Sequence, residues 1–109
     1  MTTINNSIQL TGRAGNNPTI KNLENARKMA RFAFATSKAT TNANGERISQ
    51  TQWHQVVAWG KLADVVQMQV KKGRQVAIRG MLSSRNWEDR SGQMRTKTEI
   101  VLNEIHSIS

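Results

Sequence analysis

Two tryptophans stand six residues apart in TQWHQVVAWGKLADVV, residues 51–66, a run that begins with the alternation of a β-strand. Because side chains alternate between the two faces of a strand, Trp53 and Trp59 share one face with Gln55, whereas His54 points the other way. A face that mixes tryptophan with glutamine is poorly suited to a core. Exposed indole rings on a basic protein are suited to stacking on the bases of a single nucleic-acid strand.

The net charge points to a polyanionic partner. The chain has 16 Lys and Arg against 7 Asp and Glu, a formal charge of +9. Nucleic acid is the commonest partner of such a surface, and an acidic membrane surface or plain solubility is the alternative. The basic residues are spread from Arg13 to Lys97, so we expect the folded body to carry the positive field.

Several classes of function are disfavoured by what the sequence lacks. The chain contains no cysteine, which excludes disulfides, thiolate metal sites and a cysteine nucleophile. His54 and His106 have no metal-type spacing, and no Gly-rich phosphate loop follows a strand, so we expect no metal, no cofactor and no enzymatic activity. No export signal or membrane-spanning run is visible, and we expect a cytoplasmic protein without a membrane partner.

Alternating apolar residues predict five strands. They cover about residues 6–13, residues 28–37 with Phe32 and Phe34 inward, the Trp53 run, residues 75–87, and residues 94–105. We expect Val76, Ile78 and Leu82 to point inward from the fourth strand, and Gly80 to mark a bend in it. The polar run 38–49, which contains Asn44-Gly45, predicts the connection of a hairpin.

One helix is predicted over residues 61–72. Leu62, Val65, Val66 and Val70 recur at helical spacing and form a stripe that we assign to the core. Gly73 provides a stop signal, and Lys71 and Lys72 would complement the helix dipole in the last turn. Five short strands with a helix between the third and the fourth is the order of an OB-fold, an all-β barrel that commonly binds oligonucleotides. We expect a single domain over residues 1–109.

Segments along nearly the whole chain, about residues 4–106, closely resemble the bacterial single-stranded DNA-binding protein family. The resemblance is carried by TQWHQVVAWGKLADVV, KKGRQVAIRG and SRNWEDRSGQMRTKTEIVLNEI, with shorter matches at IQLTGR and FATS. It implies a non-catalytic OB-fold that coats single-stranded DNA without reading its sequence, during replication, recombination and repair. It also implies a homotetramer, with a dimer as the alternative, located at the bacterial nucleoid or replication fork.

The resemblance also implies roles for individual residues. Those that match stacking positions are Trp53, Trp59 and Trp87. Together with the basic residues that the charge pattern singles out, the phosphate-binding candidates are Arg13, Lys38, Lys61, Lys72, Arg85, Arg95 and Lys97. The oligomer-interface candidates are His54, Gln75 and Ala77.

Three features depart from the family pattern. Lys38-Ala39-Thr40 stands where many members have a further stacking aromatic, and Met94-Arg95-Thr96 lacks a tyrosine that is often found there. Members usually continue with a flexible linker and an acidic tip that recruits other proteins. The sequence as given ends at Ser109 without either, so we assign no partner to that route.

Two other functions fit the same residues. One is an OB-fold that prefers RNA, or a primosome-type accessory protein that bridges DNA and other proteins. The other is a subunit in which the tryptophans are hot spots of a protein interface rather than stacking platforms. Tryptophan fluorescence during titration with oligo-dT, oligo-U and duplex DNA would separate the three.

Overall fold

The computed structural model describes residues 7–108, apart from the side chains of Ala26 and Arg85. Its elements are β1 (Ile8–Ala14), β2 (Thr19–Leu23), a 3₁₀ turn (Glu24–Ala26), β3 (Arg27–Thr41), β4 (Arg47–Trp59), α1 (Lys61–Gln69), β5 (Gln75–Glu88) and β6 (Met94–Ser107). No described helix has the length and apolar character needed to span a membrane.

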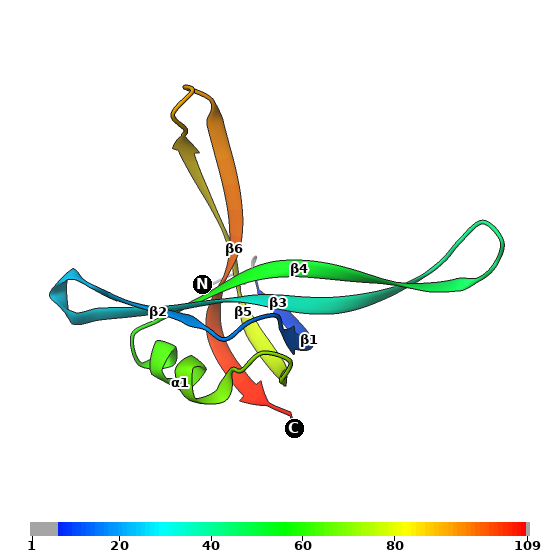
Figure 1. Ribbon diagram of the computed structural model, residues 1–109, viewed down its shortest axis with the longest axis horizontal. Coiled ribbons are helices and arrows are strands. Elements are labelled where there is room, and N and C mark those ends of the chain that lie inside the picture. The colour runs from blue at the N-terminus through cyan, green and yellow to red at the C-terminus, as the bar shows by residue number, and fades with distance from the viewer. Residues whose placement is uncertain (1–6, 109) are drawn as a thin grey trace, which may run out of the picture.

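The strands form a closed barrel with hairpins that extend beyond it (Figure 1). Their order is β1-β5-β6-β4-β3-β2, and a further pairing of β1 with β3 closes the ring of five strands. The pair β4–β6 is parallel, and the other pairs are antiparallel. The expected OB-fold order, five barrel strands with a helix between the third and the fourth, is therefore confirmed, with β2 added beside the N-terminal part of β3, residues 27–31 (Figure 1).

Closure of the barrel depends on β1, which pairs with β5 along most of its length and reaches β3 at Arg13 and Ala14. At Gly12 the backbone comes so close to β3 that a Cβ atom would lie 2.0 Å from the Ala35 carbonyl oxygen. Gly80 makes a similar approach, where a Cβ would lie 2.4 Å from the Val101 carbonyl oxygen. A β-bulge at Arg79/Gly80 agrees with the expected bend.

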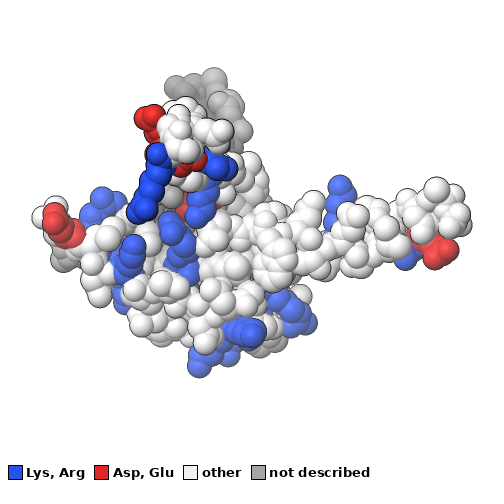
Figure 2. Space-filling view, turned by 45° about the horizontal axis from the view of Figure 1, so that its top comes forward, with Lys and Arg blue, Asp and Glu red and all other residues white. Residues whose placement is uncertain are grey.

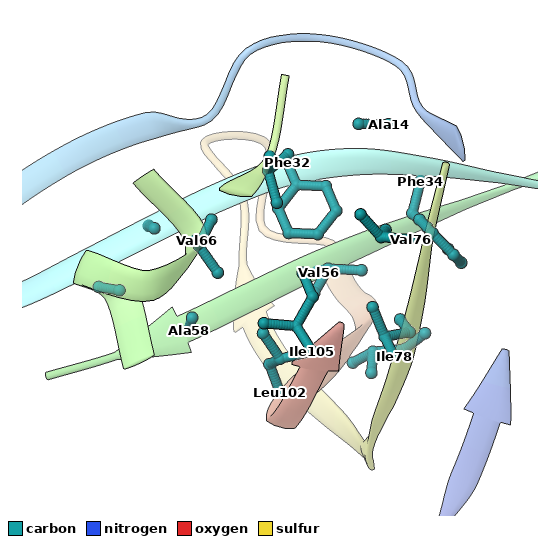
Figure 3. Close-up of a cluster of buried hydrophobic side chains, with 14 residues drawn as sticks. Ala14, Phe32, Phe34, Val56, Ala58, Val66, Val76, Ile78, Leu102 and Ile105 are labelled. Atoms are coloured by element: carbon teal, nitrogen blue, oxygen red, sulfur yellow. The ribbon is translucent and has the colours of Figure 1, made fainter. Parts of the chain in front are cut away.

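The core fills the barrel with aliphatic side chains around two phenylalanines (Figure 3). Phe32 and Phe34 are fully buried, and their rings meet edge to face with centroids 6.3 Å apart. Burial of each such ring stabilises the fold by roughly 1.5–3 kcal/mol. Val66 and Val70 of the predicted stripe are buried in this core, Leu62 and Val65 are partly buried against it, and Ala63, which the stripe did not include, is buried as well.

The helix ends earlier than predicted. It stops at Gln69, and Val70 is already extended, so Lys71 and Lys72 do not lie in the last turn. Gly60, with φ 64°, precedes the helix. The Lys28 ammonium on β3 donates to the Asp64 carboxylate and to the Gln67 side-chain oxygen, which ties the helix to the sheet.

Three further expectations are corrected by the structure. The polar run 38–49 is mostly strand, because the β3–β4 ladder continues to Thr41 and Arg47 and leaves only a short turn. Leu82 is 44% exposed rather than inward, because this part of β5 has left the barrel for the β5–β6 hairpin. The apolar alternation predicts no strand over residues 19–23, whereas Thr19–Leu23 forms β2.

Gly12→Ala is expected to lower the free energy of unfolding by about 1–3 kcal/mol, because the new methyl group would meet a carbonyl oxygen that the β1–β3 pairing holds in place. Urea denaturation measures the change. Thr11→Ala, at an exposed neighbouring site on β1, is the control and is expected to change stability by no more than about 0.5 kcal/mol. Equal stability of the two variants would contradict this account of barrel closure.

Candidate nucleic-acid interface

The strand register brings the three tryptophans to one outer face of the sheet. Trp53 and Trp59 lie on the outer side of β4, roughly 20 Å apart along the strand. Between them Val57 pairs with Val101 of β6 and so lies on the same face of the sheet. Arg95 shares that face of β6 because it is six residues from Val101, and it pairs with Trp87 of β5. The three side chains are 63%, 37% and 42% exposed, in chain order. We call this surface, on the outer side of β3, β4, β6 and the β5–β6 hairpin, the tryptophan face.

Trp53 is held against the turn between β1 and β2. A Cβ atom on Gly15 would lie 2.4 Å from Trp53 Cζ3, so only glycine leaves room for the ring in this position. The turn is itself bound to β3, since the Gly15 amide donates to the Ala33 carbonyl at 2.8 Å and the Ala33 amide donates to Asn16 Oδ1 at 2.9 Å. Trp53 thus has a fixed support on one side and solvent on the other.

Trp59 ends β4 and has a different environment. Its cross-strand partner Met29 is buried, and the guanidinium carbon of Arg27 lies 4.7 Å from the centroid of the indole ring. That distance is within the range of a cation–π interaction. Part of the Trp59 ring is therefore already in contact with a cation.

Trp87 lies on the β5–β6 hairpin, across from Arg95 in the ladder. Arg95 Nε donates to Asp89 Oδ2 at 2.8 Å, and Asp89 Oδ1 accepts from the amides of Ser91 and Gln93. The Arg95 guanidinium, with these turn donors, lowers the pKa of Asp89 from 3.8 to about 2. Part of the Arg95 charge is therefore neutralised within the hairpin.

Arg13 and Lys72 lie near the Trp53 end of the tryptophan face. Arg13 pairs with Ala35, which pairs with Trp53, so two strand spacings of about 10 Å in all separate Arg13 from that indole. Arg13 Nη1 donates to the Gly73 carbonyl at 2.9 Å, beside Lys72 in the chain. The exposed Lys72 is thereby brought into the same region.

The other predicted cations are distributed unevenly. Lys61 is exposed at the first position of α1, two residues after Trp59, and Lys97 is half-buried on the tryptophan face of β6. Arg85 pairs with Lys97 in the ladder, but its side chain lies outside the described part of the molecule. Strand alternation puts Lys38 on the side of the β3–β4 hairpin opposite Trp53, so the structure does not bring these two together.

Sequence reasoning missed an ion pair in the middle of the tryptophan face. Arg31 Nη2 lies 3.2 Å from Glu99 Oε2, and the two side chains are 30% and 13% exposed. Arg31 pairs with Val57 in the ladder, so it stands between the two tryptophans of β4. Its Nε atom is buried and has no hydrogen-bond partner among the described residues. Arg27 was missed as well. The alternation that puts Phe32 and Phe34 inward would have indicated that both arginines point outward.

Basic side chains are concentrated near the barrel rather than on the β3–β4 hairpin. Figure 2 shows Lys and Arg gathered around the base of the upright β5–β6 hairpin, with fewer on the long hairpin at the right. Acidic residues occur at the turns of the hairpins, at Glu24, Glu46 and Asp89. Positive charge is therefore dense at the base of the β5–β6 hairpin, where it would attract a polyanion.

The residues predicted for an oligomer interface lie on two separate surfaces. His54 is half-buried on the inner side of β4, where its Nε2 is hydrogen-bonded to Thr36 Oγ1 at 3.0 Å. Gln75 and Ala77 lie on the outer side of β5, opposite Arg13 and Thr11 of β1. Ala77 also lines a hollow of about 210 Å³ beside Arg79, Glu104 and His106, where hydrogen bonding from His106 and the charge of Arg79 lower the pKa of the Glu104 carboxyl.

Residues 5–108 match the family described as the single-strand binding protein family. The chain is 38% identical over 104 residues to a protein of Chlorobaculum tepidum named single-stranded DNA-binding protein 1, covering 94% of this chain and 64% of that protein. It therefore spans less than two thirds of the length of this relative. A solved structure described as the Plasmodium falciparum SSB complex with ssDNA superimposes with a TM-score of 0.89 at 31% identity, covering 100% of this chain and 99% of the other.

Gly15→Ala is expected to displace the Trp53 ring, because the added methyl group would occupy space that the ring now fills. The emission of Trp53 can be followed alone in a Trp59→Phe, Trp87→Phe background. The substitution should shift its emission maximum while the far-UV circular dichroism stays unchanged. An unchanged Trp53 spectrum would show that the turn does not support the ring.

Asp89 gives the hairpin a pH dependence whose sign follows from its lowered pKa. A carboxylate with a folded pKa of about 2 contributes its stabilisation above its ordinary value of 3.8 and loses it as the pH falls through 2. NMR titration of the Asp89 carboxyl carbon should give a midpoint near pH 2, and Arg95→Ala should raise it because the first cause of the shift is removed. A midpoint near 3.8 in the unsubstituted protein would contradict the turn described here.

Proposed function

Because this chain belongs to the single-strand binding protein family, we propose that it binds single-stranded DNA by stacking bases on the tryptophan face and neutralising phosphates with the surrounding cations. The observation that carries the proposal is the alignment of Trp53, Trp59 and Trp87 on one outer face of a protein with net charge +9. The names of the two related proteins favour DNA over RNA as the ligand.

Exposure of the indoles supports a stacking role over a structural one. A tryptophan that served only the core would be largely buried, whereas Trp53 is 63% exposed and makes its supporting contact through one edge of the ring. One stacked base contributes about 1–3 kcal/mol by alanine substitution. Duplex DNA keeps its base faces within the helical stack, so the same surface selects single strands without reading a sequence.

Phosphate neutralisation is assigned to the cations that border the tryptophan face. Arg13 and Lys72 serve the Trp53 end, Lys61 the Trp59 end, and Lys97 with Arg85 the β5–β6 hairpin. Each phosphate neutralised on a single strand adds about 0.7 to the negative slope of log affinity against log salt. Arg95 and Lys38 contribute less, because Arg95 is paired with Asp89 and Lys38 lies on the opposite side of its hairpin.

The role we propose is protection of exposed strands during replication, recombination and repair, in the cytoplasm, without catalysis. Stacking and charge neutralisation need no positioned nucleophile or base, and the family is one of binding proteins. A subunit whose tryptophans are protein-interface hot spots remains the alternative. It is distinguished by the effect of alanine substitutions on assembly instead of on DNA affinity.

We also propose that the chain assembles as a homotetramer, with a dimer as the alternative, through surfaces that include His54, Gln75 and Ala77. Support comes from their position on two different sides of the sheet, with His54 on the inner side of β4 and Gln75 and Ala77 on the outer side of β5, since two distinct contacts are what a dimer of dimers requires. Light scattering after size exclusion should give a mass close to four times the chain mass of 12.2 kDa. A mass of one chain would overturn the proposal, and twice that mass would support the dimer.

Trp53→Ala is expected to weaken binding of oligo-dT by roughly 5- to 150-fold, because one stacking platform is lost. Fluorescence anisotropy of labelled oligo-dT measures affinity, and intrinsic tryptophan fluorescence of the unsubstituted protein should be strongly quenched on binding. Trp53→Phe, which keeps a π-face, is the matched variant and should retain most of the affinity.

Duplex DNA and oligo-U of matched length separate the alternatives in the same titration. We expect far weaker binding of duplex DNA, and an affinity that falls with salt. Equal affinity for duplex DNA, or oligo-dT binding without quenching, would contradict stacking. Stronger binding of oligo-U than of oligo-dT would support the RNA-binding alternative.

A further inference from the structure

Arg27 lies at an edge of the tryptophan face and has no role in the stacking and phosphate contacts proposed above. It is the first residue of β3, next to the turn that joins β2 to β3 (Figure 1). Met29, two residues further on, pairs with Trp59, so Arg27 reaches Trp59 along the diagonal of the β3–β4 ladder. Its guanidinium carbon lies 4.7 Å from the centroid of the indole.

The charge of Arg27 is available to a ligand, unlike that of other arginines on the sheet. Arg31 is paired with Glu99 and Arg95 with Asp89, at 3.2 Å and 2.8 Å. Arg27 forms no ion pair with any described residue, and its side chain is exposed. Its guanidinium contacts the Trp59 indole, and this contact leaves the positive charge unneutralised.

Because the Arg27 guanidinium lies over the Trp59 ring, a base that binds at this site contacts the guanidinium before the indole. Where the guanidinium covers the ring, a base cannot contact the indole directly, and Trp59 is 37% exposed against 63% for Trp53. The guanidinium plane is itself a surface on which bases stack. Its N–H donors radiate within that plane, so it can bind a phosphate at its edge while its face carries a base.

We propose that Arg27 and Trp59 form one composite nucleotide subsite, in which a base of the single strand stacks on the guanidinium and an adjacent phosphate accepts its N–H donors. This inference rests on the proposed binding of single-stranded DNA. It extends the strand path from Trp59 toward the β2–β3 turn, where Leu23, 39% exposed, pairs with Arg27 in the ladder and offers an apolar flank. Trp59 then acts mainly as the support that holds the guanidinium flat.

Three substitutions test the subsite by anisotropy with labelled oligo-dT at several salt concentrations. Arg27→Ala should weaken binding at least fivefold and reduce the salt slope by about 0.7, because one phosphate contact is lost. Arg27→Lys should keep the slope but recover only part of the affinity, because an ammonium group lacks the planar surface. Lys71→Ala removes an equal charge beside the groove at Pro18 and Val70, whose lining contains neither Arg27 nor Trp59, and should change the affinity and the slope less than Arg27→Ala does.

A second readout separates a binding role from a merely structural one. In a Trp53→Phe, Trp87→Phe background, Trp59 is the one remaining tryptophan of the three. Oligo-dT should quench its emission weakly when Arg27 is present and more strongly after Arg27→Ala, because the ring is then open to direct stacking. A loss of fold would instead lower the melting temperature and change the far-UV circular dichroism.

The outcomes distinguish this inference from the function on which it rests. If the unsubstituted protein binds oligo-dT and Arg27→Ala leaves both affinity and salt slope unchanged, the composite subsite is wrong and the proposed function stands. Strong quenching of Trp59 with Arg27 in place would likewise overturn it. If the unsubstituted protein does not bind oligo-dT, both fail together.

Discussion

The close approach of β1 to β3 at Gly12 is the constraint on which the rest of the molecule depends. With no side chain at that position, β1 can pair with β5 and with β3 in turn and close the barrel around Phe32 and Phe34. A closed ring gives the sheet a defined outer surface and pairs the edges that β1 and β3 would otherwise expose. The hairpins can then extend beyond the core, because the barrel fixes the register from which they grow.

The tryptophan face combines exposed indole rings with cations of which only some are free to bind a phosphate, because others are held in ion pairs. The three indoles differ in setting: Trp53 rests on the turn at Gly15, Trp59 contacts the Arg27 guanidinium, and Trp87 lies on a hairpin whose turn is organised by Asp89. Arg31 is held by Glu99 in the centre of the face. Net charge alone therefore overstates how many cations a bound strand can use, and position within the ladder decides which ones contribute.

Much of the fold was predictable because its main signals are local. The alternation around Phe32 and Trp53 indicated the two central strands and their inner and outer faces, and the helical stripe at Val66 indicated the segment that closes the core. The segment Thr19–Leu23 was missed because it has one half-buried apolar residue, Ile20, and is held mainly by backbone pairing with β3. The sequence does not predict the strand pairing within the polar run 38–49 for a related reason: its ladder lies outside the core, so no apolar alternation marks it.

The site was less accessible to sequence reasoning than the fold. Strand parity put Trp53 and Trp59 on one face, but the relation of Trp87 to them needed the β4–β6 pairing, which joins residues far apart in the chain. The Arg27–Trp59 contact and the Arg31–Glu99 ion pair are likewise cross-strand, so their detection requires the register.

The central claim is that the outer face of the sheet, with its three indoles, is where a single strand lies. The most direct test is to follow the three indole Nε1–H resonances and the backbone amides by NMR while unlabelled oligo-dT is added. The account predicts large shifts for the indoles of Trp53 and Trp87, a smaller one for Trp59, and little change at the α1 amides that follow Lys61, residues 62–69. Shifts confined to α1 or to the outer side of the β1–β5 pair, with the three indole signals unmoved, would contradict it.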